Sequence, residues 1–155
     1  MYTPSVPFVP TPEPVARKML ELAEVKPGEL VYDLGCGDGR IIILAATEFG
    51  ARAIGIEIRK DLVERCREKI RQLGLEDRVR VIHGDMFKID IGDADVVTLY
   101  LLTSVNKMLR PKLEKELKHG ARVVSHDFEI TGWKPVKIEE LHESWRSHKI
   151  YLYVR

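Results

Sequence analysis

A glycine-rich turn, Asp33-Leu34-Gly35-Cys36-Gly37-Asp38-Gly39, follows a short apolar segment of the chain. Glycines permit a tight turn and let a ligand touch bare backbone ahead of a following helix. The spacing D-x-G-x-G-x-G differs from the G-x-G-x-x-G of dinucleotide sites, and the lysine of a phosphate-binding P-loop is missing. An acid at the start of the turn would repel a pyrophosphate but suits a ligand with an ammonium group.

S-adenosylmethionine is such a ligand, because it carries an amine and a sulfonium but no phosphate. The residues of the turn expected to bind it are Asp33, Gly35, Cys36, Gly37 and Gly39. The alternative is an ordinary glycine-rich connection between a strand and a helix.

Two further acids end the next two apolar segments. Glu57 closes the second segment, where an acid can accept both ribose hydroxyls of a nucleoside. Asp85 follows the third, where it can accept the exocyclic amine of an adenine, with Met86 against the ring. Alone, each acid could equally be a solvated residue at a strand end. Acids at the ends of three neighbouring strands of one sheet together favour a single ligand that contains adenosine.

The elements that would position these acids alternate along the chain. Buried strands are expected at residues 30–34, 53–58, 79–83, 95–102 and 121–128. Helices are expected from Thr11-Pro12, with Thr11 as N-cap, to about residue 25, and at residues 40–49, 60–73 and 104–118, the last interrupted at Pro111. The βαβαβαβαβ pattern predicts a parallel sheet covered by helices, with the acids along its carboxyl edge.

The end of the chain has a different pattern. Residues 136–141 and 149–154 both alternate between apolar and polar side chains, and residues 143–148 connect them. Two such segments predict an antiparallel hairpin. The expected fold class is therefore α/β, a Rossmann-like three-layer sandwich with a mostly parallel seven-stranded sheet that ends in this hairpin. Residues 1–155 form one domain, in which residues 1–11 are a proline-rich arm.

The composition limits the partners and the setting. With 25 Lys and Arg against 24 Asp and Glu, no overall basic field attracts nucleic acid or a membrane, and a local basic patch is the alternative. No apolar run is long enough to span a bilayer, and the first residues do not resemble a signal peptide. Two cysteines cannot form a disulfide framework, so the cytoplasm is the expected location. Asn106 and Gln72 are the only amides amid many charges, a pattern typical of a thermophile.

Beyond these arguments, the chain resembles a known family. The turn at residues 33–39, Glu57 and Asp85 resemble the cofactor motifs of class I S-adenosylmethionine-dependent methyltransferases. Further segments are similar to the small archaeal protein-lysine methyltransferases, which are related to mitochondrial enzymes that methylate lysines of ATP synthase and the adenine nucleotide carrier. These segments are residues 6–13, 32–40, 101–103, 111–117 and 123–128 and Gly132-Trp133, so the resemblance covers nearly the whole chain.

The resemblance also implies a role for the proline-rich arm. It would fold over the cofactor as a lid, with Thr11 at a helix N-terminus near the methionine carboxylate. The alternative is a floppy tail.

Three residues at the ends of the fourth and fifth strands are candidates for catalysis. Tyr100 could line the path of an amine, because its ring face attracts a cation. His126 and Asp127 could orient that amine or relay its proton. The alternatives are core packing for Tyr100 and a satisfied buried histidine for His126. The histidines show no metal-ligand spacing, and no metal is expected.

Two kinds of DNA methyltransferase are excluded. The residues after the fourth strand, Thr98-Leu99-Tyr100-Leu101, lack the proline-containing box of enzymes that methylate the amino groups of DNA bases. Neither Cys36 nor Cys66 is placed to be the nucleophile that cytosine C5 enzymes need.

The expected function is a protein-lysine N-methyltransferase of broad specificity, acting on proteins with exposed lysines. A small-molecule or RNA methyltransferase and a non-catalytic cofactor-binding module are the alternatives.

Overall fold

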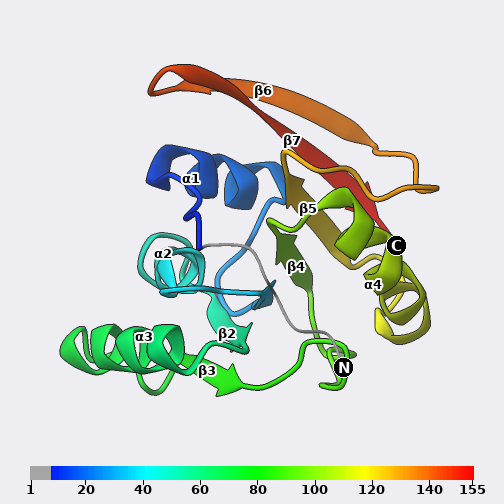
Figure 1. Ribbon diagram of the computed structural model, residues 1–155. Coiled ribbons are helices and arrows are strands. Elements are labelled where there is room, and N and C mark those ends of the chain that lie inside the picture. The colour runs from blue at the N-terminus through cyan, green and yellow to red at the C-terminus, as the bar shows by residue number, and fades with distance from the viewer. Residues whose placement is uncertain (1–7) are drawn as a thin grey trace.

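A computed structural model describes residues 8–155 of the chain (Figure 1). Residues 1–7 of the expected arm lie outside the described residues. The helices are α1 (Glu13–Leu22), α2 (Arg40–Phe49), α3 (Lys60–Gln72) and α4 (Thr103–Glu116). The strands are β1 (Leu30–Leu34), β2 (Arg52–Glu57), β3 (Val79–His83), β4 (Val96–Leu99), β5 (Arg122–His126), β6 (Lys137–Glu143) and β7 (Arg146–Val154).

The seven strands form one sheet in the order β3-β2-β1-β4-β5-β7-β6. The first five in that order run parallel, whereas β7 is antiparallel to both β5 and β6. All five residues of β1 are buried, as expected for a central parallel strand covered on both faces. The predicted fold class is therefore confirmed, including the antiparallel hairpin at the end of the chain.

Two apolar clusters fill the two faces of the sheet. One contains the inward side chains of α1, α2 and α3, and the other contains those of α4. Figure 1 shows these helices on opposite sides of the strands. Strand β7 contributes to both clusters, because Ile150 and Leu152 belong to the first and Tyr151 and Tyr153 to the second. Its alternating pattern therefore reflects two buried faces.

The strict alternation of strands and helices is wrong at one connection. Residues 84–95, between β3 and β4, contain no helix. Met86 and Ile91 are buried in the α4-side cluster, so this loop covers part of the sheet face itself.

Helix α4 also differs from expectation, because it continues through Pro111 without a break. Proline removes one backbone hydrogen bond there. Leu109 and Leu113, on either side of it, are fully buried, and their packing keeps the helix continuous.

The hairpin strands are longer than predicted. Glu143 pairs directly with Arg146, so only Ser144 and Trp145 form the turn. Ser144 takes a left-handed backbone conformation with φ of 59°. Most of the expected connection at residues 143–148 therefore belongs to the strands.

The connection between β5 and β6 contains no helix, as the sequence indicated. Side chains of the neighbouring elements hold it instead. The Asn106 amide donates to the Phe128 carbonyl at 3.2 Å, and Arg110 donates to the Thr131 carbonyl at 2.9 Å. The backbone N–H of Ile130 donates to the Tyr153 hydroxyl at 2.9 Å. Within residues 8–155, no helix combines the length and apolar character needed to cross a lipid bilayer.

Replacing Tyr153 with Phe tests how this connection is held. Tyr153→Phe leaves the buried Ile130 N–H without a partner, which should lower the free energy of unfolding by about 1–3 kcal/mol. Urea denaturation followed by circular dichroism measures the change. Tyr151→Phe is the matched control, because the Tyr151 hydroxyl makes no hydrogen bond to the described residues. Equal stability of the two variants would contradict the assignment.

Candidate active site

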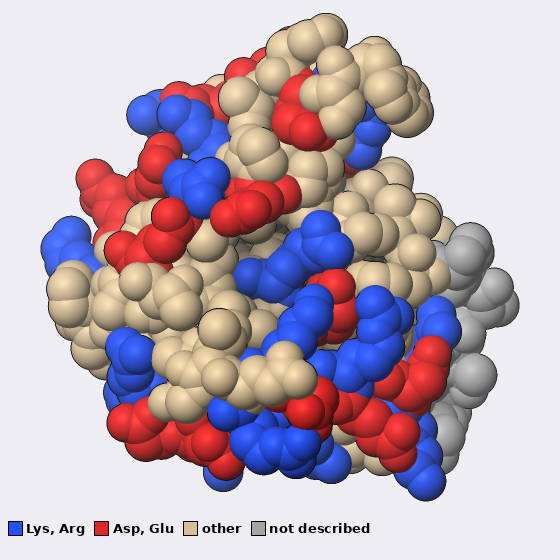
Figure 2. Space-filling view, turned by 90° about the vertical axis from the view of Figure 1, so that its left-hand side faces the viewer, with Lys and Arg blue, Asp and Glu red and all other residues tan. Residues whose placement is uncertain are grey.

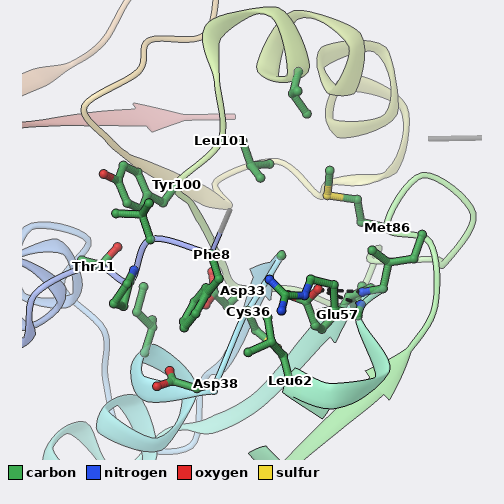
Figure 3. A pocket seen from close by; sticks show the side chains of 18 of the residues that line it. Phe8, Thr11, Asp33, Cys36, Asp38, Glu57, Leu62, Met86, Tyr100 and Leu101 are labelled. Atoms are coloured by element: carbon green, nitrogen blue, oxygen red, sulfur yellow. Dashed lines mark hydrogen bonds between the residues drawn. The ribbon is translucent and has the colours of Figure 1, made fainter. Parts of the chain in front are cut away.

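A cavity of about 520 Å³ lies at the carboxyl edge of the parallel strands (Figure 3). Its volume is in the range of small-molecule sites. Eight of the expected site residues line it: Thr11, Asp33, Gly35, Cys36, Glu57, Asp85, Met86 and Tyr100. Gly37, Gly39, His126 and Asp127 are not part of the lining.

The glycines of the turn at residues 33–39 have left-handed backbones. The φ angles of Gly35, Gly37 and Gly39 are 78°, 58° and 88°. A Cβ on Gly37 would lie 2.2 Å from Phe8 Cε1, and one on Gly39 would lie 2.3 Å from Cys66 Sγ. Both glycines are therefore needed for the conformation and for close packing against the chain's own side chains.

Asp33 is a buried carboxylate at the floor of the cavity. Its side chain is 4% exposed and accepts a hydrogen bond from the Thr98 hydroxyl at 2.9 Å. Burial raises the pKa of Asp33 to about 7, against the effect of the Thr98 hydrogen bond, and the charges of Glu57 and Asp38 raise it further. An ammonium group beside Asp33 would favour its ionised form. The site therefore fits the amino group of S-adenosylmethionine.

Glu57 joins the end of β2 to the glycine-rich turn. Its Oε1 accepts the N–H of Gly37 at 2.8 Å, and its Oε2 accepts the N–H groups of Ile58 and Arg59 at 3.0 and 2.9 Å. A carboxylate has about four acceptor positions, so capacity remains for a ribose hydroxyl. Figure 3 shows Glu57 and Met86 on the same side of the cavity.

The end of the cavity beside Glu57 has a mainly apolar lining next to the Asp85 carboxylate. Met86 is buried, and Asp85 accepts the N–H of Phe87 at 2.9 Å. Ile58 and Leu62 also line the cavity. Cys36 is buried, and its hydrogen bond with Cys66, together with burial, raises the pKa of its thiol. It therefore stays protonated at neutral pH and contributes packing, not a nucleophile.

An ion-pair network that was not predicted from the sequence lies beside the turn. Asp38 is buried and accepts hydrogen bonds from Arg40 at 3.1 Å and from Lys69 at 3.2 Å. Burial alone would raise the pKa of Asp38, but the hydrogen bonds from Arg40 and Lys69 outweigh it and lower that pKa. Arg40 also donates to the Thr11 carbonyl at 3.2 Å and so ties the N-terminal segment to the turn. In the sequence, only the charged residues Asp38 and Arg40 on either side of Gly39 pointed to this network.

The other end of the cavity is aromatic. Tyr100 lines it, and its ring is stacked on the His126 ring with 4.0 Å between centroids. His126 is fully buried behind Tyr100, and burial lowers its pKa to about 4. The Asp127 carboxylate forms an ion pair with Arg146 at 2.9 Å and accepts the Lys149 N–H at 3.1 Å. Of these three residues, only Tyr100 lines the cavity. Catalytic roles for Tyr100, His126 and Asp127 stay predictions.

Thr11 is not the N-cap of α1, contrary to expectation. Pro12 holds that position and no side chain caps the helix. The Thr11 hydroxyl instead lies 3.1 Å from Nδ1 of His126. Phe8, Val9 and Pro10 also line the cavity, so the described part of the arm forms one of its walls.

Residues 8–155 contain one group of side chains that are close enough together to share a metal ion. Ligand atoms of His126, Asp127 and His148 lie within 4.8 Å of one another. The two imidazoles are 2.8 Å apart between Nε2 of His126 and Nδ1 of His148, which is a hydrogen-bond distance. Asp127 is already paired with Arg146. This geometry is that of a hydrogen-bonded pair beside an ion pair.

The sheet order, the glycine-rich turn and the acids at three strand tips define a class I S-adenosylmethionine-dependent methyltransferase. Residues 33–137 match the model of the ANTKMT methyltransferase domain, and the chain belongs to that family.

Two curated relatives and one solved structure place the chain within this family. A protein-lysine N-methyltransferase of Saccharolobus islandicus is 51% identical over 99% of this chain and 96% of its own length. The mouse adenine nucleotide translocase lysine N-methyltransferase is 38% identical over 86% of this chain, which spans 58% of that protein. A crystal structure described as an RNA methyltransferase of Salinibacter ruber with S-adenosyl-L-homocysteine has a TM-score of 0.90 and 48% identity, covering 94% of this chain and 93% of that one. The predicted family and cofactor are thus confirmed.

Replacing Asp33 with Asn should have opposite effects on binding and on stability. The loss of the charged partner should weaken binding of S-adenosylhomocysteine, which carries the same amino group, by about 10- to 100-fold in calorimetry. At pH 8 the ionised Asp33 is buried in the free protein, so Asp33→Asn should raise the free energy of unfolding by more than about 1 kcal/mol. A variant that is destabilised at pH 8 would contradict this account.

The pH dependence of binding provides a separate test. Because the pKa of Asp33 is about 7 in the free protein, the protonated form predominates below that pH. Affinity for S-adenosylhomocysteine should fall as the pH is lowered from 7.5 to 5.5, approaching roughly tenfold per pH unit. Calorimetry across this range measures it. The Asp33→Asn variant should show a flat profile, and an equally steep profile in that variant would assign the titration to another group.

Proposed function

We propose that this methyltransferase transfers methyl groups from S-adenosylmethionine to the ε-amines of lysine residues in proteins. The observation that carries the proposal is the 51% identity, over nearly the full length of both chains, to a protein-lysine N-methyltransferase. The mouse relative also acts on a lysine, according to its name. The aromatic end of the cavity, formed by Tyr100, is compatible with an amine acceptor.

The chain's own residues hold the two substrates in line. Asp33 and Glu57 would hold the amino and ribose groups of the donor, and Tyr100 would guide the lysine. The bound donor supplies an electrophilic methyl, which forms a bond to the neutral lysine nitrogen as its bond to sulfur breaks and leaves the electron pair on sulfur.

The lysine must first lose a proton. With an ordinary pKa of about 10.4, deprotonation at pH 7 costs about 4.6 kcal/mol. The apolar wall around Tyr100 and the positive charge of the donor's sulfonium would both lower the pKa of the lysine. Alignment of the two reactants supplies much of the remaining acceleration, up to roughly 7–11 kcal/mol in well-oriented systems.

Broad specificity is part of the proposal. The connection between β5 and β6 is a short loop at residues 127–136 with no inserted domain over the cavity. A site with no inserted domain on this loop suits a lysine on a protein surface better than one enclosed metabolite.

RNA is the second candidate substrate, because the Salinibacter ruber protein is described as an RNA methyltransferase. RNA binding favours a continuous basic surface. Figure 2 shows Lys and Arg side chains lying among Asp and Glu over the face that it presents. The net charge of the chain is only +1. These observations favour a protein substrate.

The deciding experiment offers both acceptors to the enzyme at once. Purified protein is incubated with donor carrying a labelled methyl group, together with lysate proteins and total RNA, and the label in each fraction is counted. We expect label in protein, on lysines located by mass spectrometry, and its loss in Asp33→Asn. Label confined to RNA would refute the proposal, and no label in either fraction would favour a binding module.

A further inference from the structure

A row of polar side chains joins the cavity wall to the C-terminal hairpin. The Thr11 hydroxyl lies 3.1 Å from Nδ1 of His126, and Nε2 of His126 lies 2.8 Å from Nδ1 of His148. Nε2 of His148 lies 3.6 Å from the Glu143 carboxylate. Both rings are buried, with exposures of 0% and 2%. Their nitrogens are therefore shielded from solvent, and the tautomer of each ring depends on the protein groups around it.

The carboxylate at the end of the row gives it a direction. At 3.6 Å the Glu143 carboxylate is just beyond hydrogen-bond distance, but its negative charge favours a proton on Nε2 of His148. In the neutral ring Nδ1 is then an acceptor, and Nε2 of His126 must donate to it. The Asp127 carboxylate, 3.5 Å from the same Nε2, favours that tautomer too. Nδ1 of His126 is left as an acceptor, and the Thr11 hydroxyl donates to it.

The direction determines what Thr11 can offer a ligand. Its hydroxyl proton is committed to His126, so only the lone pairs of the oxygen remain for the cavity. Those lone pairs suit an N–H group and repel a carboxylate. Figure 3 places Thr11 beside Tyr100, at the opposite end of the cavity from Glu57 and Met86. Thr11 therefore lies at the end where the amine is expected.

We propose that Thr11 accepts a hydrogen bond from the acceptor amine, and that Glu143 and His148 are positioning residues that fix this polarity through His126. The inference rests on the proposed lysine substrate. It differs from the cofactor-carboxylate contact that the family resemblance implies for Thr11. Holding one amine N–H on Thr11 leaves the nitrogen lone pair free for the methyl group.

The tautomers can be measured without any substrate. Long-range ¹H–¹⁵N spectra of the full chain at pH 8 report which nitrogen of each histidine carries the proton. We expect the Nε2–H form for both His126 and His148, and an Nδ1–H form for either would overturn the proposal. Glu143→Gln should shift this balance, because its amide can donate to His148. Glu140→Gln, on an exposed residue of the same strand, is the control and should leave it unchanged.

Kinetics with a lysine peptide test the role of the hydroxyl. Thr11→Val should lower kcat/KM about tenfold or more, whereas Thr11→Ser should stay within about threefold of the wild type. Calorimetric affinity for S-adenosylhomocysteine should change less than about twofold in Thr11→Val. A loss of that affinity with unchanged peptide kinetics would assign Thr11 to the cofactor and overturn the proposal.

The positioning residues and the proposed function are tested separately. Glu143→Gln should lower kcat/KM several-fold, while Glu140→Gln should not. Equal activity of the two variants would remove Glu143 from the mechanism. If label enters only RNA, the lysine function fails while the tautomer spectra still decide the polarity. If lysine is methylated but the tautomers are reversed, only this further inference fails.

Discussion

The site depends on a carboxylate that is kept out of water. Asp33 stands at the end of the central strand β1, where both faces of the sheet are covered, and its hydrogen bond to Thr98 on β4 only partly offsets its burial. A buried carboxylate without a cation is unfavourable. A positively charged group of a ligand beside Asp33 would offset the unfavourable burial of this carboxylate.

The order of the strands in the sheet places different groups of residues at the two ends of the cavity. Strands β1, β2 and β3 lead into the residues that are expected to bind an adenosyl group, and Glu57 also holds the glycine-rich turn in place. Strands β4 and β5 supply the aromatic end, which the hairpin supports from behind through Arg146 and His148. The hairpin therefore does more than complete the sheet, because it sets the surroundings of Tyr100 and His126.

Local patterns in the sequence predict the strands and the edge of the sheet at which the acids lie. Short apolar runs predicted the parallel strands. The D-x-G-x-G-x-G turn with Glu57 and Asp85 predicted acids at one edge of the sheet, and the three acids line one cavity there, because parallel strands end at the same edge. The predictions were wrong where contacts between residues far apart in the sequence determine the local structure. Thr11 and His126 are 115 positions apart, so the hydroxyl looked like a helix cap. The packing of Leu109 and Leu113, not the propensity of Pro111, decided the course of α4.

The carboxylates at the strand tips have a kinetic consequence. Donor and spent donor share an amino group, a ribose and an adenine, which are the groups that Asp33, Glu57 and Asp85 are proposed to contact. The two forms differ at the sulfur, which is positively charged only in the donor, so discrimination between them would depend on that charge and not on the shared contacts. The spent donor would then compete for the same site as it accumulates, and the ratio of the two forms in the surroundings would limit the rate of turnover.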